Sequence, residues 1–138
     1  MKKTISILGS TGSIGVSTLK IIEKNKYLFN VKLLSANKNY KLIINQIRIY
    51  KPDYFVVNDK ITFNKIKKKI RGNKTKILNS FKNIKFKKKL DICISAIPGI
   101  AGLSPTILMT QLSKKLLIAN KESIICGWLL LRSNAKKY

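Results

Sequence analysis

Three glycines spaced three residues apart form the first candidate site. The segment Gly9-Ser10-Thr11-Gly12-Ser13-Ile14-Gly15 follows a short apolar run, residues 4–8, and opens a helical pattern. In that context the first glycine allows a tight turn, Gly12 lets the backbone approach a pyrophosphate, and Gly15 permits close helix–strand packing. Free N–H groups and the helix dipole would attract the phosphates. No lysine follows at the P-loop offset, so the segment is not a P-loop. Its position between a strand and a helix favours dinucleotide binding over a plain glycine-rich turn. The spacing G-x-x-G-x-x-G alone is less specific than G-x-G-x-x-G.

The second candidate site is the polar stretch after the second apolar run. A site for NAD(H) usually has Asp or Glu there to accept the ribose 2′-hydroxyl. No carboxylate stands between Glu23 and Asp53, and the stretch instead offers Asn37, Lys38 and Asn39. Because a 2′-phosphate is attracted by ammonium and amide donors, we expect NADP(H) rather than NAD(H). The alternative is an ordinary polar surface turn.

The third candidate site is Asn120-Lys121-Glu122-Ser123, which follows the last apolar run of strand type. Ligands of open parallel sheets bind at the carboxyl ends of the strands. Lys121 could engage a substrate hydroxyl or phosphate, and Asn120 and Glu122 could orient a nicotinamide. Helix capping explains the same residues equally well, because Asn or Ser at the N-cap and Glu in the first turn stabilise a helix. The spacing leaves both interpretations open.

Composition excludes several other chemistries. The 138 residues contain no His, which excludes imidazole bases and Ser-His-Asp triads. Five scattered carboxylates argue against a metal site built from this chain alone. Two cysteines, Cys93 and Cys126, make neither a disulfide scaffold nor a zinc site and indicate a reducing, cytoplasmic compartment. No signal peptide is recognisable, and the longest apolar run, residues 124–131, is too short for a membrane span of ~20 residues.

The net charge of +24 raises the possibility of a nucleic-acid partner. The cations are densest at residues 65–69 and 85–89. Only three of them are Arg, the residue that base contacts and bidentate phosphate contacts favour. The chain is also rich in Asn and Ile, which share A/T-rich codons with Lys, so compositional bias explains the charge better than nucleic-acid binding does.

A regular alternation of strands and helices must position these sites. Short apolar runs predict buried parallel strands, and apolar residues three and four apart predict helices. The expected strands are 4–8, 29–36, 54–57, 75–78, 90–96 and 116–119, and the expected helices are 13–25, 40–50, 61–70, 104–113 and one that opens at 120–123. Residues 80–89 are not assigned. Short connections imply right-handed βαβ units, so the sequence predicts a Rossmann-like α/β fold: a doubly wound, mostly parallel sheet with helices on both faces.

Three segments, in order and spacing, resemble the 1-deoxy-D-xylulose 5-phosphate reductoisomerase family. They are residues 9–15, Ala96-Ile97-Pro98-Gly99-Ile100-Ala101-Gly102-Leu103 and Ala119-Asn120-Lys121-Glu122-Ser123. The resemblance covers nearly the whole chain but only the amino-terminal NADPH domain of the family. It implies an oxidoreductase, usually a homodimer, that uses NADPH and Mg²⁺ or Mn²⁺. The family enzyme rearranges and reduces 1-deoxy-D-xylulose 5-phosphate to 2-C-methyl-D-erythritol 4-phosphate in non-mevalonate isoprenoid biosynthesis.

The resemblance also assigns residues to ligands. The NADPH pyrophosphate would lie along Thr11, Gly12, Ser13 and Ile14. The adenosine phosphate would be held by Asn37, Lys38 and Asn39, although the family more often has Gly where Asn37 stands. At the third site, Asn120 and Glu122 would contact NADPH, and Lys121 would bind the sugar phosphate substrate.

The resemblance implies that residues 1–131 form the NADPH-binding domain. Residues 132–138 have no apolar periodicity, so we expect them to form a frayed tail. The family's metal-binding carboxylates, lid and carboxy-terminal domain come after this point. We therefore expect no metal ligand and no catalytic residue here, and a fragment that is inactive alone. Two alternatives stay open: a reductase domain of the semialdehyde dehydrogenase type, which would need a Cys nucleophile with a base partner, and a basic nucleic-acid-binding module.

Overall fold

The computed structural model describes all residues, 1–138, as an alternation of strands and helices. The elements in chain order are β1 (Lys3–Leu8), α1 (Ser13–Lys24), β2 (Phe29–Ala36), α2 (Tyr40–Tyr50), β3 (Tyr54–Val57), α3 (Lys60–Lys69), β4 (Lys76–Leu78), β5 (Leu90–Ser95), the short 3₁₀ helix η1 (Ile100–Gly102), α4 (Leu103–Leu112), β6 (Ser113–Ile118) and α5 (Lys121–Lys137). Every strand and helix expected from the sequence is present. None of the helices combines the length and the apolar character that a membrane-spanning helix requires.

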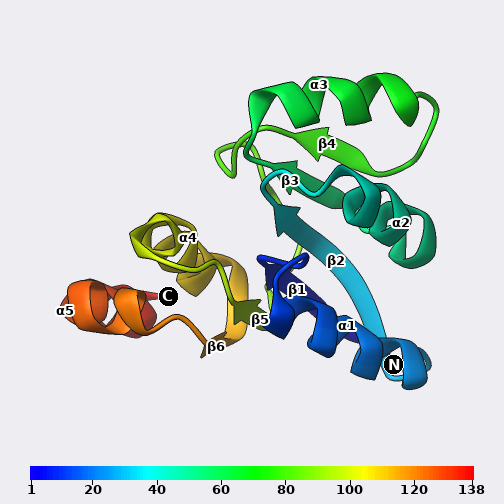
Figure 1. Cartoon of the computed structure of the whole chain (residues 1–138). Coiled ribbons are helices and arrows are strands. Elements are labelled where there is room, and N and C mark those ends of the chain that lie inside the picture. The colour runs from blue at the N-terminus through cyan, green and yellow to red at the C-terminus, as the bar shows by residue number, and fades with distance from the viewer.

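The six strands form one sheet in the order β4-β3-β2-β1-β5-β6, and every pairing is parallel. From β1 the chain first builds outward through β2, β3 and β4, and then returns to place β5 on the other side of β1. Right-handed crossovers in opposite directions put their helices on opposite faces. Figure 1 shows α1 and α2 on one side of the sheet and α4 and α5 on the other. The predicted doubly wound α/β fold is confirmed.

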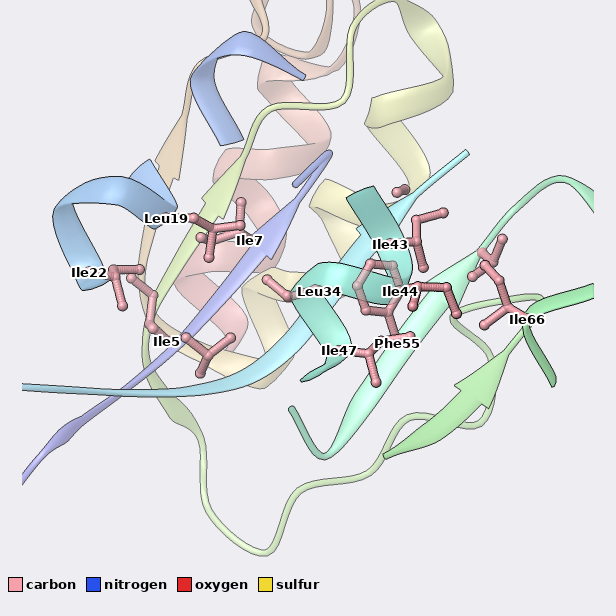
Figure 2. Close-up of a cluster of buried hydrophobic side chains, with 13 residues drawn as sticks. Ile5, Ile7, Leu19, Ile22, Leu34, Ile43, Ile44, Ile47, Phe55 and Ile66 are labelled. Carbon is pink, nitrogen blue, oxygen red and sulfur yellow. The ribbon is translucent and has the colours of Figure 1, made fainter. Parts of the chain in front are cut away.

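The larger part of the core lies between the sheet and helices α1, α2 and α3. Alternate residues of a strand face one side, so Ile5 and Ile7 of β1 point into this layer. Ile43 and Ile47 of α2 belong to the same layer because residues four apart share a helix face. Figure 2 shows Ile43, Ile44 and Ile47 around Phe55 of β3, and Ile5 and Ile7 farther along the sheet beside α1. This apolar layer fixes the three helices against the strands.

The opposite face of the sheet is covered in part by irregular chain. Leu33 and Cys93 belong to this second cluster, with Met109 from α4 above them. Ile84, from the stretch left unassigned in the sequence, is buried in the same cluster. Residues 79–89 thus cover the sheet without forming a helix or a strand. Their apolar residues pack, but no helical or strand period links them, which explains why the sequence pattern was ambiguous.

The structure corrects the carboxyl-terminal part of the sequence prediction. β6 begins at Ser113, three residues earlier than expected, and α5 continues to Lys137. Residues 132–137, expected to fray, are helical. They lack apolar periodicity because the helix there is exposed, while Lys136 and Lys137 stand where the helix dipole favours cations. The domain boundary at residue 131 itself stays a prediction.

Candidate functional site

The glycine segment forms the connection between β1 and α1, at the carboxyl edge of the sheet. Gly9 has φ +82°, and a Cβ there would lie 2.6 Å from the Ala96 carbonyl oxygen. A Cβ on Gly15 would collide with the Gly9 carbonyl and lie 2.6 Å from the Ser10 Cα. These two glycines therefore allow the turn and the close helix packing that their spacing predicted. A Cβ on Gly12 would meet only the Gly9 oxygen, at 3.5 Å, so that position is open.

The first turn of α1 presents free backbone donors beside this open position. Gly12 is the N-cap, and no side chain caps the helix. The first helical bond runs from Val16 N to Gly12 O at 2.8 Å, while the N–H groups of Ser13, Ile14 and Gly15 have no acceptor in the chain. Unpaired N–H groups and the positive end of the dipole make such a turn suited to an anion.

A cleft of about 390 Å³ brings the first and third candidate sites together. It lies where the strand order reverses between β1 and β5, the position at which open α/β sheets bind ligands. One wall is the start of α1, a second is the loop after β5, and a third is the start of α5. The lining residues are Gly12, Ser13, Ile14, Ala96, Ile97, Pro98, Ala119, Asn120, Lys121 and Glu122.

Asn120 holds two of these walls together. Its side chain is buried, and its Nδ2 donates to the carbonyls of Ile97 and Gly99, the latter at 2.9 Å. Its Oδ1 accepts from Ser123 N at 3.1 Å, which caps α5. A Cβ on Gly102 would collide with this amide, so Gly102 gives it room. Asn120 thus has the helix-capping role, and both of its amide hydrogens are engaged within the chain.

Lys121 and Glu122 line the same cleft without being tied into it. Lys121 is exposed and Glu122 is half-buried. Neither forms an ion pair, since the two ion pairs of the structure lie elsewhere, between Lys32 and Asp53 and between Lys114 and Asp91. Lys121 and Glu122 are therefore available to a ligand in the cleft.

The second candidate site lies at the same sheet edge but outside the cleft. Asn37, Lys38 and Asn39 follow β2 and are all exposed. Asn39 is the N-cap of α2, and its Oδ1 accepts from Leu42 N at 3.2 Å. Hydrogen bonds from Thr62 and the charge of Lys38 lower the pKa of Asp59. The Lys38 charge thus acts on an anionic group beyond the end of β3. Thr11, at the turn into α1, also stands outside the lining set.

The sequence analysis missed the polar residues that lie behind the glycine loop. Ser10, Ser35 and Gln46 are almost fully buried and are joined by hydrogen bonds. One signal was present: Gln46 is a polar residue within the apolar stripe of α2, between Ile43 and Ile47. A polar side chain on a buried helix face needs a partner.

Two alternative chemistries find no support in the geometry. Burial raises the pKa of the Cys93 thiol to about 12, so Cys93 is not an activated nucleophile. Cys126 is exposed on α5, and no His exists to serve either thiol as a base. No three Asp, Glu, Cys or His side chains gather anywhere in the chain. Glu122 is the one carboxylate in the cleft lining, so these residues do not fit a divalent cation.

All four lysines of residues 85–89 line a groove at the opposite edge of the sheet. The groove has a volume of about 920 Å³ and contains nine lysines against two aspartates. Both aspartates are already paired, Asp53 with Lys32 and Asp91 with Lys114. The lysines of residues 65–69 lie apart from it, exposed on α3.

Comparisons with known proteins agree with this geometry. Residues 5–127 match the family model described as 1-deoxy-D-xylulose 5-phosphate reductoisomerase. The enzyme of that name from Pelagibacter ubique is 41% identical over 140 residues, which cover 99% of this chain and 36% of that protein. The Zymomonas mobilis enzyme in complex with NADPH has a TM-score of 0.86 at 28% identity, covering 99% of this chain and 37% of that one.

A further reductoisomerase structure, in complex with NADPH, fosmidomycin and magnesium, has a TM-score of 0.88 at 29% identity. It covers 98% of this chain and 34% of its own. The chain thus spans about a third of the length of the relatives that it matches.

Proposed function

The chain belongs to the 1-deoxy-D-xylulose 5-phosphate reductoisomerase family, and from that premise we propose that its cleft binds NADPH. One observation carries the proposal: three segments far apart in the sequence meet at one cleft, at the switch point of the sheet, beside a helix start with free N–H donors. Such a turn binds phosphate through backbone donors and the dipole together.

The proposed roles follow the positions of the residues around the cleft. The pyrophosphate lies against the backbone of residues 11–14. The 2′-phosphate lies at residues 37–39, outside the cleft. An extended dinucleotide reaches both places by lying along the carboxyl edge of the sheet. Glu122 contacts the nicotinamide end, and Lys121 binds the sugar phosphate. For Asn120 we favour positioning over direct contact, since its amide already holds Ile97, Gly99 and Ser123.

The activity proposed for the whole protein is the NADPH-dependent rearrangement and reduction of 1-deoxy-D-xylulose 5-phosphate. In this reaction NADPH supplies the hydride that reduces the rearranged aldehyde. The residues of this chain supply the cofactor cleft and one cation for the sugar phosphate. Because the chain belongs to this family, we also propose that the whole protein is a homodimer. The two free cysteines support a reducing, cytoplasmic location.

Titration of the chain with NADPH and NADH, followed by cofactor fluorescence, tests the proposal. We expect saturable binding with NADPH at least tenfold tighter, because only NADPH carries the 2′-phosphate that Lys38 and its neighbours would bind. The matched control is Lys121→Ala, which should leave cofactor affinity within about twofold because its proposed contact is with the substrate. Absence of saturable NADPH binding would contradict the proposal.

A second candidate function rests on the lysine-lined groove at the amino edge of the sheet. Nine lysines face two aspartates that are both already paired, so the groove favours a phosphate chain without base readout. Two aromatic rings line the groove, and Tyr54 and Phe86 pack edge to face with their centroids 5.5 Å apart. Binding of a labelled single-stranded RNA that survives 200 mM salt and is lost in Lys87→Glu/Lys88→Glu would support this function. Binding erased by salt would reduce it to non-specific attraction.

A further inference from the structure

A buried polar contact ties the glycine loop to two other elements from behind. Ser10 is 0% exposed, Ser35 of β2 is 1% exposed and Gln46 of α2 is 4% exposed. The Ser10 hydroxyl donates to Gln46 Oε1 at 2.6 Å, and Gln46 Nε2 donates back to the Ser10 carbonyl at 2.9 Å. The Ser10 N–H donates to the Ser35 carbonyl at 2.7 Å. We call this set, Ser10 with Ser35 and Gln46, the loop lock.

The loop lock fixes backbone that would otherwise be free to rotate. Gly9 and Gly12 flank the locked segment, and glycine has the widest backbone freedom of any residue. The N–H and the carbonyl of Ser10 are both bound, to Ser35 and to Gln46, so this residue cannot turn in either direction. Its orientation sets the path of residues 11–14 into α1, where the free N–H groups of Ser13 and Ile14 lie at the cleft.

We infer that Gln46 is a positioning residue for phosphate binding: through Ser10 it holds the glycine loop in the form that presents its N–H groups to the cleft. The inference rests on the proposed function for its ligand, since it deepens how NADPH would be bound. Gln46 itself lines no part of the cleft, and it acts through the loop.

The chemistry of the side chain explains why an amide stands there. The contact needs one acceptor for the Ser10 hydroxyl and one donor for the Ser10 carbonyl, and a primary amide offers both. A carboxylate of the same shape would place an oxygen against that carbonyl. A methionine would fill the same volume but would leave the carbonyl without its donor in a buried place, which is costly.

The test compares Gln46→Met with Asn45→Met, the same substitution at the exposed neighbouring position on α2. The first readout is hydrogen exchange of loop amides that are bonded in the structure, Ser10, Gly12 and Val16. The second is exchange of Gly102 and Ala119, bonded amides near the other walls of the cleft. The third is NADPH affinity of the 138-residue chain.

Gln46→Met removes both hydrogen bonds to Ser10, although the Ser10 hydroxyl keeps the Ser35 carbonyl as an acceptor. We therefore expect Gln46→Met to speed exchange of the loop amides about tenfold and to weaken NADPH binding by a similar factor, the size of one net buried bond. Exchange at Gly102 and Ala119 should stay within about twofold of the unmodified chain, as should every readout in Asn45→Met. If Gln46→Met does not fold, Ser10→Ala takes its place, with an expected effect of about threefold because one neutral bond is lost.

Equal acceleration at both sets of amides would make Gln46 a general stabiliser of the fold and overturn the inference. Unchanged loop exchange, or unchanged NADPH affinity in a chain that binds NADPH, would overturn it as well. Failure of the unmodified chain to bind NADPH would overturn the proposed function, and the exchange readout would still decide whether Gln46 holds the loop.

Discussion

Helices α1 and α5 both begin at the cleft, yet their first turns are built in opposite ways. The α1 start has a glycine at the N-cap and free N–H donors. The α5 start has Asn120 at the N-cap, and the same amide ties the helix to the loop after β5. One wall is therefore open to an anion, and the other is closed by the protein's own hydrogen bonds. A binding cleft needs both, because a ligand site is precise only when its surroundings are rigid.

The largest expected effect concerns the two glycines of the α1 start. Ala usually stabilises a helix over Gly by ~1 kcal/mol. For Gly15→Ala we expect the reverse, a loss of about 3 kcal/mol in the free energy of unfolding, because its Cβ would collide with the Gly9 carbonyl. Urea denaturation measures this loss.

The matched control is Gly12→Ala, whose Cβ meets only one oxygen, at 3.5 Å. It should change the free energy of unfolding by less than ~1 kcal/mol while weakening NADPH binding, since the methyl group stands where the pyrophosphate would approach. Equal stability losses in the two variants would remove the distinction between a packed glycine and an open one.

Asn120→Ala tests the closed wall. We expect a loss of about 2–3 kcal/mol in the free energy of unfolding, because the helix loses its cap and two loop carbonyls lose their donor. Asn120→Asp separates the two roles, since the carboxylate can still cap the helix but cannot donate to Ile97 and Gly99. A denaturation midpoint for Asn120→Asp equal to that of the unmodified chain would mean that the hydrogen bonds from Asn120 to the Ile97 and Gly99 carbonyls contribute nothing to stability.

Lys38→Glu tests whether the start of α1 is sufficient to distinguish NADPH from NADH, or whether Lys38, outside the cleft, is also needed. We expect NADPH affinity to fall by about tenfold and NADH affinity by less than about twofold, because only NADPH carries the 2′-phosphate. The control is Lys41→Glu, an exposed charge reversal in the first turn of α2. Losses of equal size for NADPH and NADH in Lys38→Glu would show that Lys38 does not discriminate between them.

The smallest expected effect is a loss of stability in acid. It concerns the start of a third helix, α3, which we compare with the starts of α1 and α5. Asp59 caps α3 through its bonds to Thr62, and these bonds lower its pKa in the folded chain. Its contribution is therefore complete above the unfolded pKa of ~3.9 and is lost as pH falls through the lower folded value. The caps of α1 and α5 do not titrate in this range. Nuclear magnetic resonance at falling pH should show α3 fraying first, and Asp59→Asn should remove that order.

Much of the fold was predictable from local patterns. Apolar runs and three-to-four spacing predict the strands and helices, and the glycine spacing predicts the turn at Gly9 and the close packing at Gly15 that the structure has. The stretch 79–89 and the end of α5 were not predictable, since irregular covering chain and exposed helix carry no apolar period.

The candidate site also has a part that the sequence predicts and a part that it does not. The sequence by itself determined which segments had the chemistry: glycines, amides and a lysine at the ends of predicted strands. It left open whether Asn120 caps a helix or meets a ligand. It placed Gln46 within the apolar stripe of α2 but did not identify a partner for its side chain. Only the tertiary structure shows that Asn120 caps α5 and that Gln46 bonds to Ser10, because a hydrogen bond between residues 36 positions apart depends on which elements become neighbours. Local sequence fixes the elements, whereas packing fixes their partners.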